Sequence, residues 1–99
     1  MESGTYTVDI AFRTTDPNRQ RVDYRMSRLA ALLPDSARIE PVRLDQETST
    51  VEIVIAGLQA FGPAMALDTV TRAIELAAID LPRGYLRRVT ITHVEDAGS

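Results

Sequence analysis

Two arginine-rich stretches contain the residues of this sequence whose types and spacing could do chemistry. The stretch DLPRGYLRRVT carries three arginines around a Pro, a Gly and a Tyr, and the stretch RTTDPNRQR carries three more beside a predicted helix start. Guanidinium groups and the free N–H groups of a helix start both bind phosphate or carboxylate. If the fold joins the two stretches, they predict an anion site. Its residues would be Arg13, Thr14, Thr15, Asn18, Arg83, Arg87 and Arg88.

The alternative for these arginines is ordinary surface pairing. Arg13 and Arg88 are expected to lie on the same uncovered face of neighbouring strands, where facing like charges are unfavourable and an anion would relieve them. The same end of the predicted fold also holds four carboxylates, which can pair with the arginines as exposed ion pairs of little energetic consequence. These are Asp16, Asp45, Glu47 and Asp80.

Catalytic chemistry has few residues to work with. The sequence has no cysteine, one histidine (His93), and only arginine among its 11 basic residues. Thiolate nucleophiles, Schiff-base lysines and multi-histidine metal sites within one chain are therefore excluded. His93 is expected to be structural. We predict that the protein is not an enzyme and carries neither a metal nor a cofactor.

The first half of the chain predicts a strand, a helix and a hairpin. Thr5 to Arg13 alternates apolar and polar residues, as a half-buried strand does. Asp16 is the predicted N-cap, the helix is expected from Pro17 to before Pro34, and its apolar stripe has helical spacing. That stripe is Val22, Met26, Leu29, Ala30 and Leu33.

The hairpin is predicted from ARIEPVRLD and TVEIVIAG. The first of these segments contains Pro41, which cannot donate to a ladder, so it is expected to be an edge strand with a bulge. The second segment should place Val51, Ile53 and Ile55 inward.

The second half predicts a helix and a last strand. The helix opens at Gly62 and Pro63 and closes at Pro82 and Gly84. Its core stripe is Leu67, Val70, Ile74, Ala77 and Leu81. The strand RRVTITHVE should point Val89 and Ile91 inward. A further apolar group on the helix lies away from the core stripe and consists of Met65, Leu76 and Ile79. It predicts either packing against the first helix or the chain ends, or a subunit interface.

The element order βαββαβ is typical of ferredoxin-like α+β sandwiches. Right-handed crossovers then predict an antiparallel sheet of order 4-1-3-2 with both helices on one face. With 99 residues the chain should form one domain, 1–99, with an ordered core of about 5–95. No apolar run is long enough to cross a bilayer, and the start MESGTYTV lacks the blocks of a signal peptide, so we expect a cytoplasmic protein.

The predicted topology resembles that of RNA-recognition motifs, but the stacking aromatics of that family are missing from the outward positions. The net charge of −3 also opposes attraction to nucleic acid. ACT domains resemble the chain in strand order alone, since the stretch TTDPNRQ lacks their usual glycine. The sequence therefore favours a small non-catalytic protein interaction module that self-associates. Its partner is a second copy or another protein. The alternative is a regulatory domain that binds an anionic metabolite or nucleotide at the arginine-rich end.

Overall fold

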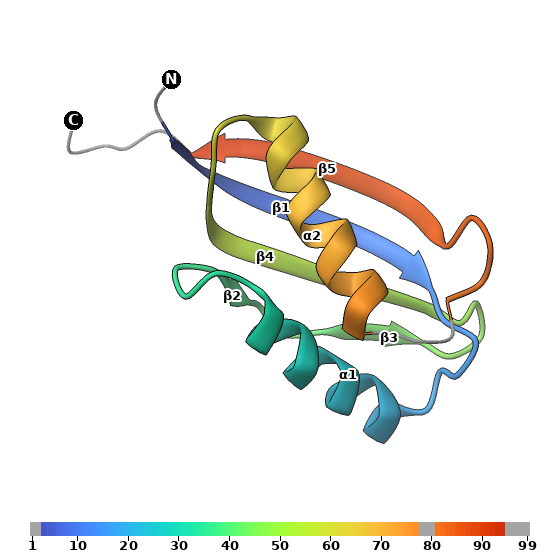
Figure 1. The fold of residues 1–99 in the computed structure, drawn as a ribbon. Helices are drawn as coiled ribbons and strands as arrows, with labels where there is room; N and C mark the ends of the chain where they lie inside the picture. The colour runs from blue at the N-terminus through green and yellow to red at the C-terminus, as the bar shows by residue number, and fades with distance from the viewer. Residues whose placement is uncertain (1–2, 78–80, 95–99) are drawn as a thin grey trace.

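The chain folds into one antiparallel sheet whose two helices lie on the same face (Figure 1). The computed structural model describes residues 3–77 and 81–94. The elements in chain order are β1 (Gly4–Arg13), α1 (Arg19–Leu32), β2 (Arg38–Ile39), β3 (Arg43–Asp45), β4 (Thr50–Ala60), α2 (Pro63–Ala77) and β5 (Leu86–Val94). This arrangement confirms the α+β class and is compatible with a two-layer sandwich.

The strand order differs from the predicted 4-1-3-2 because the segment predicted as the second strand is divided. Neighbouring strands follow the order β2-β4-β1-β5, and β3 also pairs with β4. Ile39 and Arg43 are four positions apart, whereas their partners on β4, Ile55 and Glu52, are three positions apart. The extra residue lies around Pro41, which has no N–H for the ladder. The edge is thus interrupted where the sequence predicted a bulge, and two short strands replace one.

A second bulge extends β4 beyond its predicted end at Gly57. Tyr6 and Val8 on β1 are two positions apart, but their partners Leu58 and Ile55 are three apart, so β4 holds one extra residue. Gly57 supplies it with a φ of 74°, a conformation that favours glycine. Its Cα faces the turn before β2 so closely that a Cβ would lie 2.5 Å from the carbonyl oxygen of Ser36.

Helix α1 begins two residues later than predicted. The side chain of Asn18 accepts hydrogen bonds from the N–H groups of Gln20 at 3.0 Å and Arg21 at 3.2 Å, so Asn18 is the N-cap. Asp16, the predicted cap, instead accepts from the N–H of Asn18 at 3.3 Å. Of the predicted apolar stripe, Ala30 is exposed, and the buried members are Val22, Met26, Leu29 and Leu33.

Helix α2 crosses the middle of the sheet (Figure 1) and begins at Pro63, as predicted. Its predicted stripe is partly wrong. Leu67 is only half-buried, because the contact face turns toward the small residues Ala66 and Ala73. The buried residues of α2 are Ala66, Val70, Ala73, Ile74 and Ala77. Leu81 packs against the core after the helix, and residues 78–80 lie outside the described ranges.

The core lies between the helices and the covered face of the sheet. Burying one Ile or Leu side chain contributes roughly 1.5–3 kcal/mol. The largest fully buried side chains are Phe12, Ile10, Leu29, Ile53, Ile55, Leu58 and Ile74. Among the described residues, neither helix is long and apolar enough to cross a membrane.

Candidate functional site

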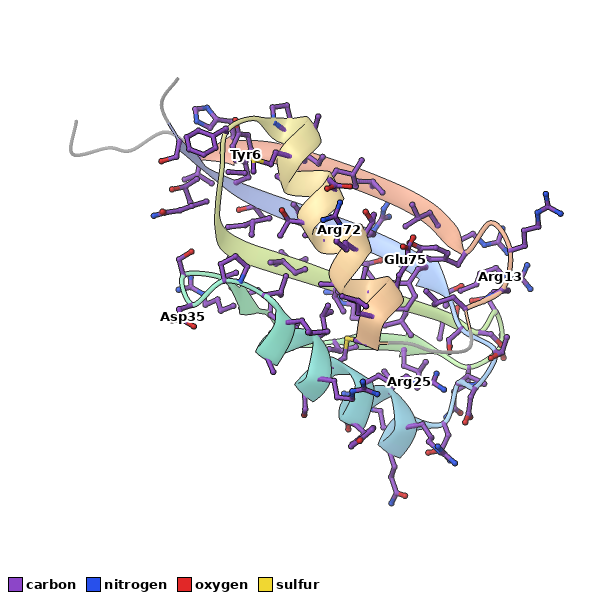
Figure 2. All side chains as sticks on the ribbon, in the orientation of Figure 1. Tyr6, Arg13, Arg25, Asp35, Arg72 and Glu75 are labelled. Carbon is purple, nitrogen blue, oxygen red and sulfur yellow. The ribbon has the colours of Figure 1, made fainter. Side chains whose placement is uncertain are left out.

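The two arginine-rich stretches do meet at one end of the sheet. Arg13 lies at the end of β1 (Figure 2), and its N–H donates to the carbonyl oxygen of Tyr85 at 2.7 Å. The side chains of Arg13, Arg83 and Arg87 are exposed there. Within residues 3–77 and 81–94, none of these three guanidinium groups makes a hydrogen bond or ion pair. This end therefore carries three cationic groups whose side chains have no partner in the described part of the chain.

Arg88 behaves differently from the other arginines of this end. The register places Ala11 opposite Arg88 and the next residue, Phe12, opposite Leu86, so Arg87 is an extra residue in β5. The expected opposition of Arg13 and Arg88 is therefore wrong: Arg88 lies opposite Ala11, two residues before Arg13.

Two carboxylates on the open sheet face hold the Arg88 side chain. Its Nη2 lies 2.9 Å from Glu52 Oε2 on β4 and 3.3 Å from Asp9 Oδ1 on β1. To reach Glu52, the side chain must cross β1 at Ala11, which is only 6% exposed although it points away from the helices. The hydrogen bond and charge of Glu52, followed by the charge of Asp9, raise the pKa of Arg88 above its ordinary value. Arg88 thus links three strands through its two carboxylate partners, and its guanidinium group is not free to bind an anion.

The polar groups at the start of α1 are also used within the fold. Thr14 is buried, accepts a hydrogen bond from Arg25 Nη1 at 3.0 Å, and accepts another from the N–H of Asp16 at 3.2 Å. Asn18 caps the helix, and the Asp16 carboxylate lies 3.7 Å from Nε of Arg21. Thr15 is exposed. A bound anion would have to compete with a cap and with a carboxylate at this position.

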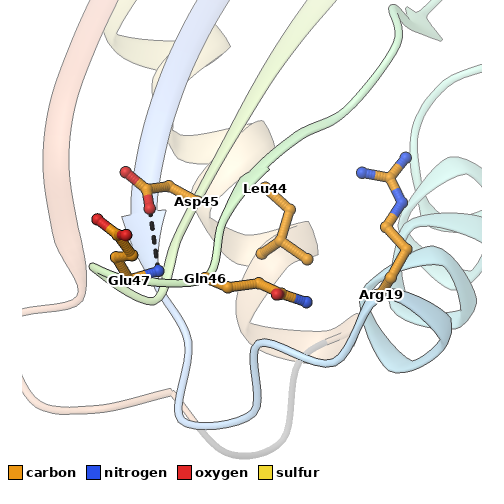
Figure 3. Close-up of a pocket in the computed structure, with 5 residues that line it drawn as sticks. All are labelled: Arg19, Leu44, Asp45, Gln46 and Glu47. Atoms are coloured by element: carbon orange, nitrogen blue, oxygen red, sulfur yellow. Dashed lines mark hydrogen bonds between the residues drawn. The ribbon is translucent and has the colours of Figure 1, made fainter.

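A shallow pocket lies beside the turn between β3 and β4. Its lining residues are Arg19, Leu44, Asp45, Gln46 and Glu47 (Figure 3). Asp45 Oδ1 accepts from the N–H of Glu47 at 3.0 Å, and Arg19 is paired with Asp23 at 3.2 Å. The charged groups therefore stabilise the turn and the helix, and they leave no set of free donors directed into the pocket.

The open sheet face is polar. Its hollow is lined by Asp9, Glu40, Pro41, Arg43, Glu52 and Val54. Glu40 pairs with Arg38 at 3.4 Å, while Asp9 and Glu52 share Arg88. No group of three or more His, Asp or Glu residues suited to a metal ion occurs in the described part of the chain. His93 is exposed, with its ring 5.0 Å from that of Tyr6.

Tyr85 links α2 to the arginine-rich end. Its ring meets Phe12 edge-on, with the ring centroids 6.5 Å apart, and its hydroxyl donates to Glu75 Oε1 at 3.0 Å. Burial of the hydroxyl, then the hydrogen bond and charge of Glu75, raise the pKa of Tyr85 to about 12. Tyr85 therefore caps one end of the core.

An exposed groove lined largely by apolar side chains lies between the two helices. Leu32 of α1 and Met65 and Leu76 of α2 line it and are 45%, 50% and 58% exposed. The remaining lining residues are Asp68, Thr69, Arg72 and Ala73. We call this surface the helical groove. It unites two of the three predicted interface residues, while Ile79 lies outside the described ranges.

Sequence reasoning missed Leu32 in the groove. Leu32 and Leu33 are consecutive, and successive helical positions point about 100° apart, so the two cannot share one face. Leu33 is buried and Leu32 is exposed. The doubled leucine at the end of α1 was therefore the available signal that one apolar side chain would face outward.

The chain matches no protein-family model, no curated protein and no solved structure.

Proposed function

We propose that this protein is a non-catalytic interaction module that self-associates through the helical groove. The observation that carries the proposal is that Leu32, Met65 and Leu76 are each about half exposed and line the same groove. Exposed apolar side chains gathered in one place mark interaction surfaces, whereas isolated ones do not. Covering them with a partner would remove apolar area from water, which stabilises a complex.

The open sheet face supports the proposal by contrast. Its strands could pack against a second sheet, but its central residues are the charged network of Asp9, Glu52 and Arg88. Burying charges carries a desolvation penalty. The helical groove also holds Asp68 and Arg72, but its three half-exposed apolar side chains offset part of that penalty when they are covered. Association through the helices is therefore favoured over association through the sheet.

We also infer that the fold is ferredoxin-like. Support comes from the order β5-β1-β4 with β2 and β3 beside β4, if these two short strands together stand for one divided edge strand. The same fold supports many functions, so the proposed function rests on the groove and not on this resemblance.

The change Leu76→Glu tests self-association. Two carboxylates would then be buried without partners in the complex, and the dissociation constant should rise at least about tenfold, equivalent to about 1.4 kcal/mol. Light scattering coupled to gel filtration should give twice the monomer mass of 10.9 kDa for the unchanged protein and a monomer for the variant.

Leu86→Glu is the matched control, because Leu86 is 38% exposed but lies on β5, outside the groove. It should leave the dimer intact. A monomeric mass for the unchanged protein at high micromolar concentration would exclude self-association. Equal effects of the two substitutions would place the interface elsewhere.

A second candidate is a regulatory domain that binds an anionic metabolite or nucleotide at the arginine-rich end. The specific observation in its favour is that Arg13, Arg83 and Arg87 lie at one end of the sheet without carboxylate partners among the described residues. Three guanidinium groups offer an anion several donors at once.

A further inference from the structure

The outer face of α2 carries a short stripe in which two charges lie between two apolar side chains. Met65, Asp68, Arg72 and Leu76 follow one another at spacings of three and four residues, which places them on one side of a helix. All four line the helical groove. Figure 2 shows Arg72 on the side of α2 that is turned away from the sheet. The stripe is therefore available to a partner.

The stripe is complementary to the same stripe on a second copy of α2 that runs in the opposite direction. Asp68 and Arg72 are centred on residue 70, and Met65 and Leu76 are centred about half a residue further on, or about 0.8 Å along the axis. A two-fold axis through this centre sets two copies of α2 antiparallel. It places Asp68 opposite Arg72 of the second copy and Met65 opposite Leu76 of the second copy. Self-complementary contacts of this kind close into a dimer.

A parallel arrangement lacks this match. It would set Asp68 against Asp68 and Arg72 against Arg72 of the second copy, and like charges in an interface oppose association. The charges of the stripe therefore select both the occupant of the groove and its direction.

We propose that a second copy of this chain occupies the helical groove, with the two α2 helices antiparallel. Two intermolecular Asp68–Arg72 ion pairs lie at the centre, and contacts between Met65 and Leu76 lie on each side. Leu32 of α1 borders the contact. This inference rests on the proposed self-association and adds its register.

Forming these pairs requires little to be given up within one chain. Arg72 Nη2 lies 3.1 Å from Asp68 Oδ2 in the same helix, and both side chains are more than 60% exposed. Exposed pairs at this helical spacing contribute little to stability. Between two copies the flanking apolar residues would exclude water, which strengthens the attraction of opposite charges. The side chains can therefore exchange an internal partner for an intermolecular one.

A charge-exchange experiment tests the register. In a homodimer of Asp68→Arg, arginine meets arginine twice, and in a homodimer of Arg72→Asp, aspartate meets aspartate twice. Each dissociation constant should rise at least about tenfold. When the two variants are mixed, both ion pairs form again, so the heterodimer should exceed the statistical half of all dimers. Native mass spectrometry separates the three dimers by mass, and thermal melting followed by circular dichroism checks that each variant is folded.

The doubly changed chain with Asp68→Arg and Arg72→Asp is the restoring control, because each arginine again faces an aspartate. Its dissociation constant should return to within a few-fold of that of the unchanged protein. If the unchanged protein is a dimer but the single variants bind as tightly and mix statistically, this register is wrong and self-association stands. If the unchanged protein is a monomer, both proposals are wrong.

Discussion

The protonated hydroxyl of Tyr85 connects the arginine-rich end of the sheet to α2. Its neutral hydroxyl donates to Glu75, and the folded protein holds the pKa at about 12 against an ordinary value of 10.0. The unfolded chain therefore releases this proton first as the pH rises. The contribution of Tyr85 to stability is complete below pH 10 and is lost as the pH approaches 12.

We predict that the free energy of unfolding falls between pH 10 and 12, and that Tyr85→Phe removes part of this fall because Phe has no proton to release. Urea unfolding followed by circular dichroism at a series of pH values measures the effect. Tyr24→Phe is the control, since Tyr24 is 62% exposed. The assignment fails if Tyr85→Phe leaves the slope of stability against pH unchanged.

Residue types alone predicted part of the candidate site. The sequence placed Arg13 and Arg87 at one end of the sheet because strand and helix periods are visible in it. It did not predict that Arg88 would pair with Asp9 and Glu52, since that depends on the strand register, which places Ala11 between Arg88 and Glu52. Strand periodicity shows which residues share a face, but it does not show which of them lie opposite one another.

Strand β4 keeps its long pairing with β1 because Gly57 accommodates the bulge between them. An added Cβ would meet two obstacles there: a positive φ of 74° and the carbonyl oxygen of Ser36 at 2.5 Å. Gly84 has a similar φ of 68°, but nothing lies within 4 Å of its Cβ position. Alanine substitutions at the two glycines therefore distinguish the cost of backbone strain, which both positions share, from the cost of steric overlap, which only Gly57 has.

We predict that Gly57→Ala lowers the free energy of unfolding by at least about 2 kcal/mol, while Gly84→Ala lowers it by about 1 kcal/mol through backbone strain alone. Chemical denaturation of both variants measures the difference. Equal losses would mean that the Ser36 turn moves aside freely and that the overlap has no cost.

Element types were predictable, but some boundaries and contact faces were not. Both Asp16 and Asn18 can cap a helix, and the hydrogen bonds of the turn, including the one that the N–H of Asp16 donates to Thr14 Oγ1, decide between them. Alanine gives no clear signal of burial. Ala30 was expected inside and is exposed, whereas Ala66 was not expected in the core and is fully buried.

At the scale of the whole molecule, charge is distributed unevenly. The net charge is −3, yet one end of the sheet presents Arg13, Arg83 and Arg87 without carboxylate partners among the described residues. Local donors can bind an anion even when the overall charge opposes its approach.

We predict that Arg87→Ala and Arg88→Ala affect thermal stability and anion binding differently, although the two residues are adjacent. Arg88→Ala should lower the melting temperature of the ligand-free protein, because Asp9 and Glu52 lose their shared partner. Arg87→Ala should leave it unchanged but reduce any stabilisation by phosphate or nucleotides, which is about 2.7 kcal/mol at 100 times the dissociation constant.

Thermal melting at constant ionic strength, with phosphate, sulfate, nucleotides and dicarboxylates in turn, measures both effects. An end that only carries surface charge would give no anion-dependent shift in the unchanged protein. A loss of stability in Arg87→Ala without anion would show that Arg87 is structural as well.

The first and last described strands are direct neighbours in the sheet, with Thr5 opposite Val94. Adjacent strands lie about 4.8 Å apart, so the polypeptide enters and leaves this fold at nearly the same point. A unit built this way can be inserted into a surface loop of another protein without separating the two sides of that loop. If two copies pair through their helical grooves, each inserted unit supplies one subunit of a dimer. Two host chains would then be joined at their loops while their own ends stay free.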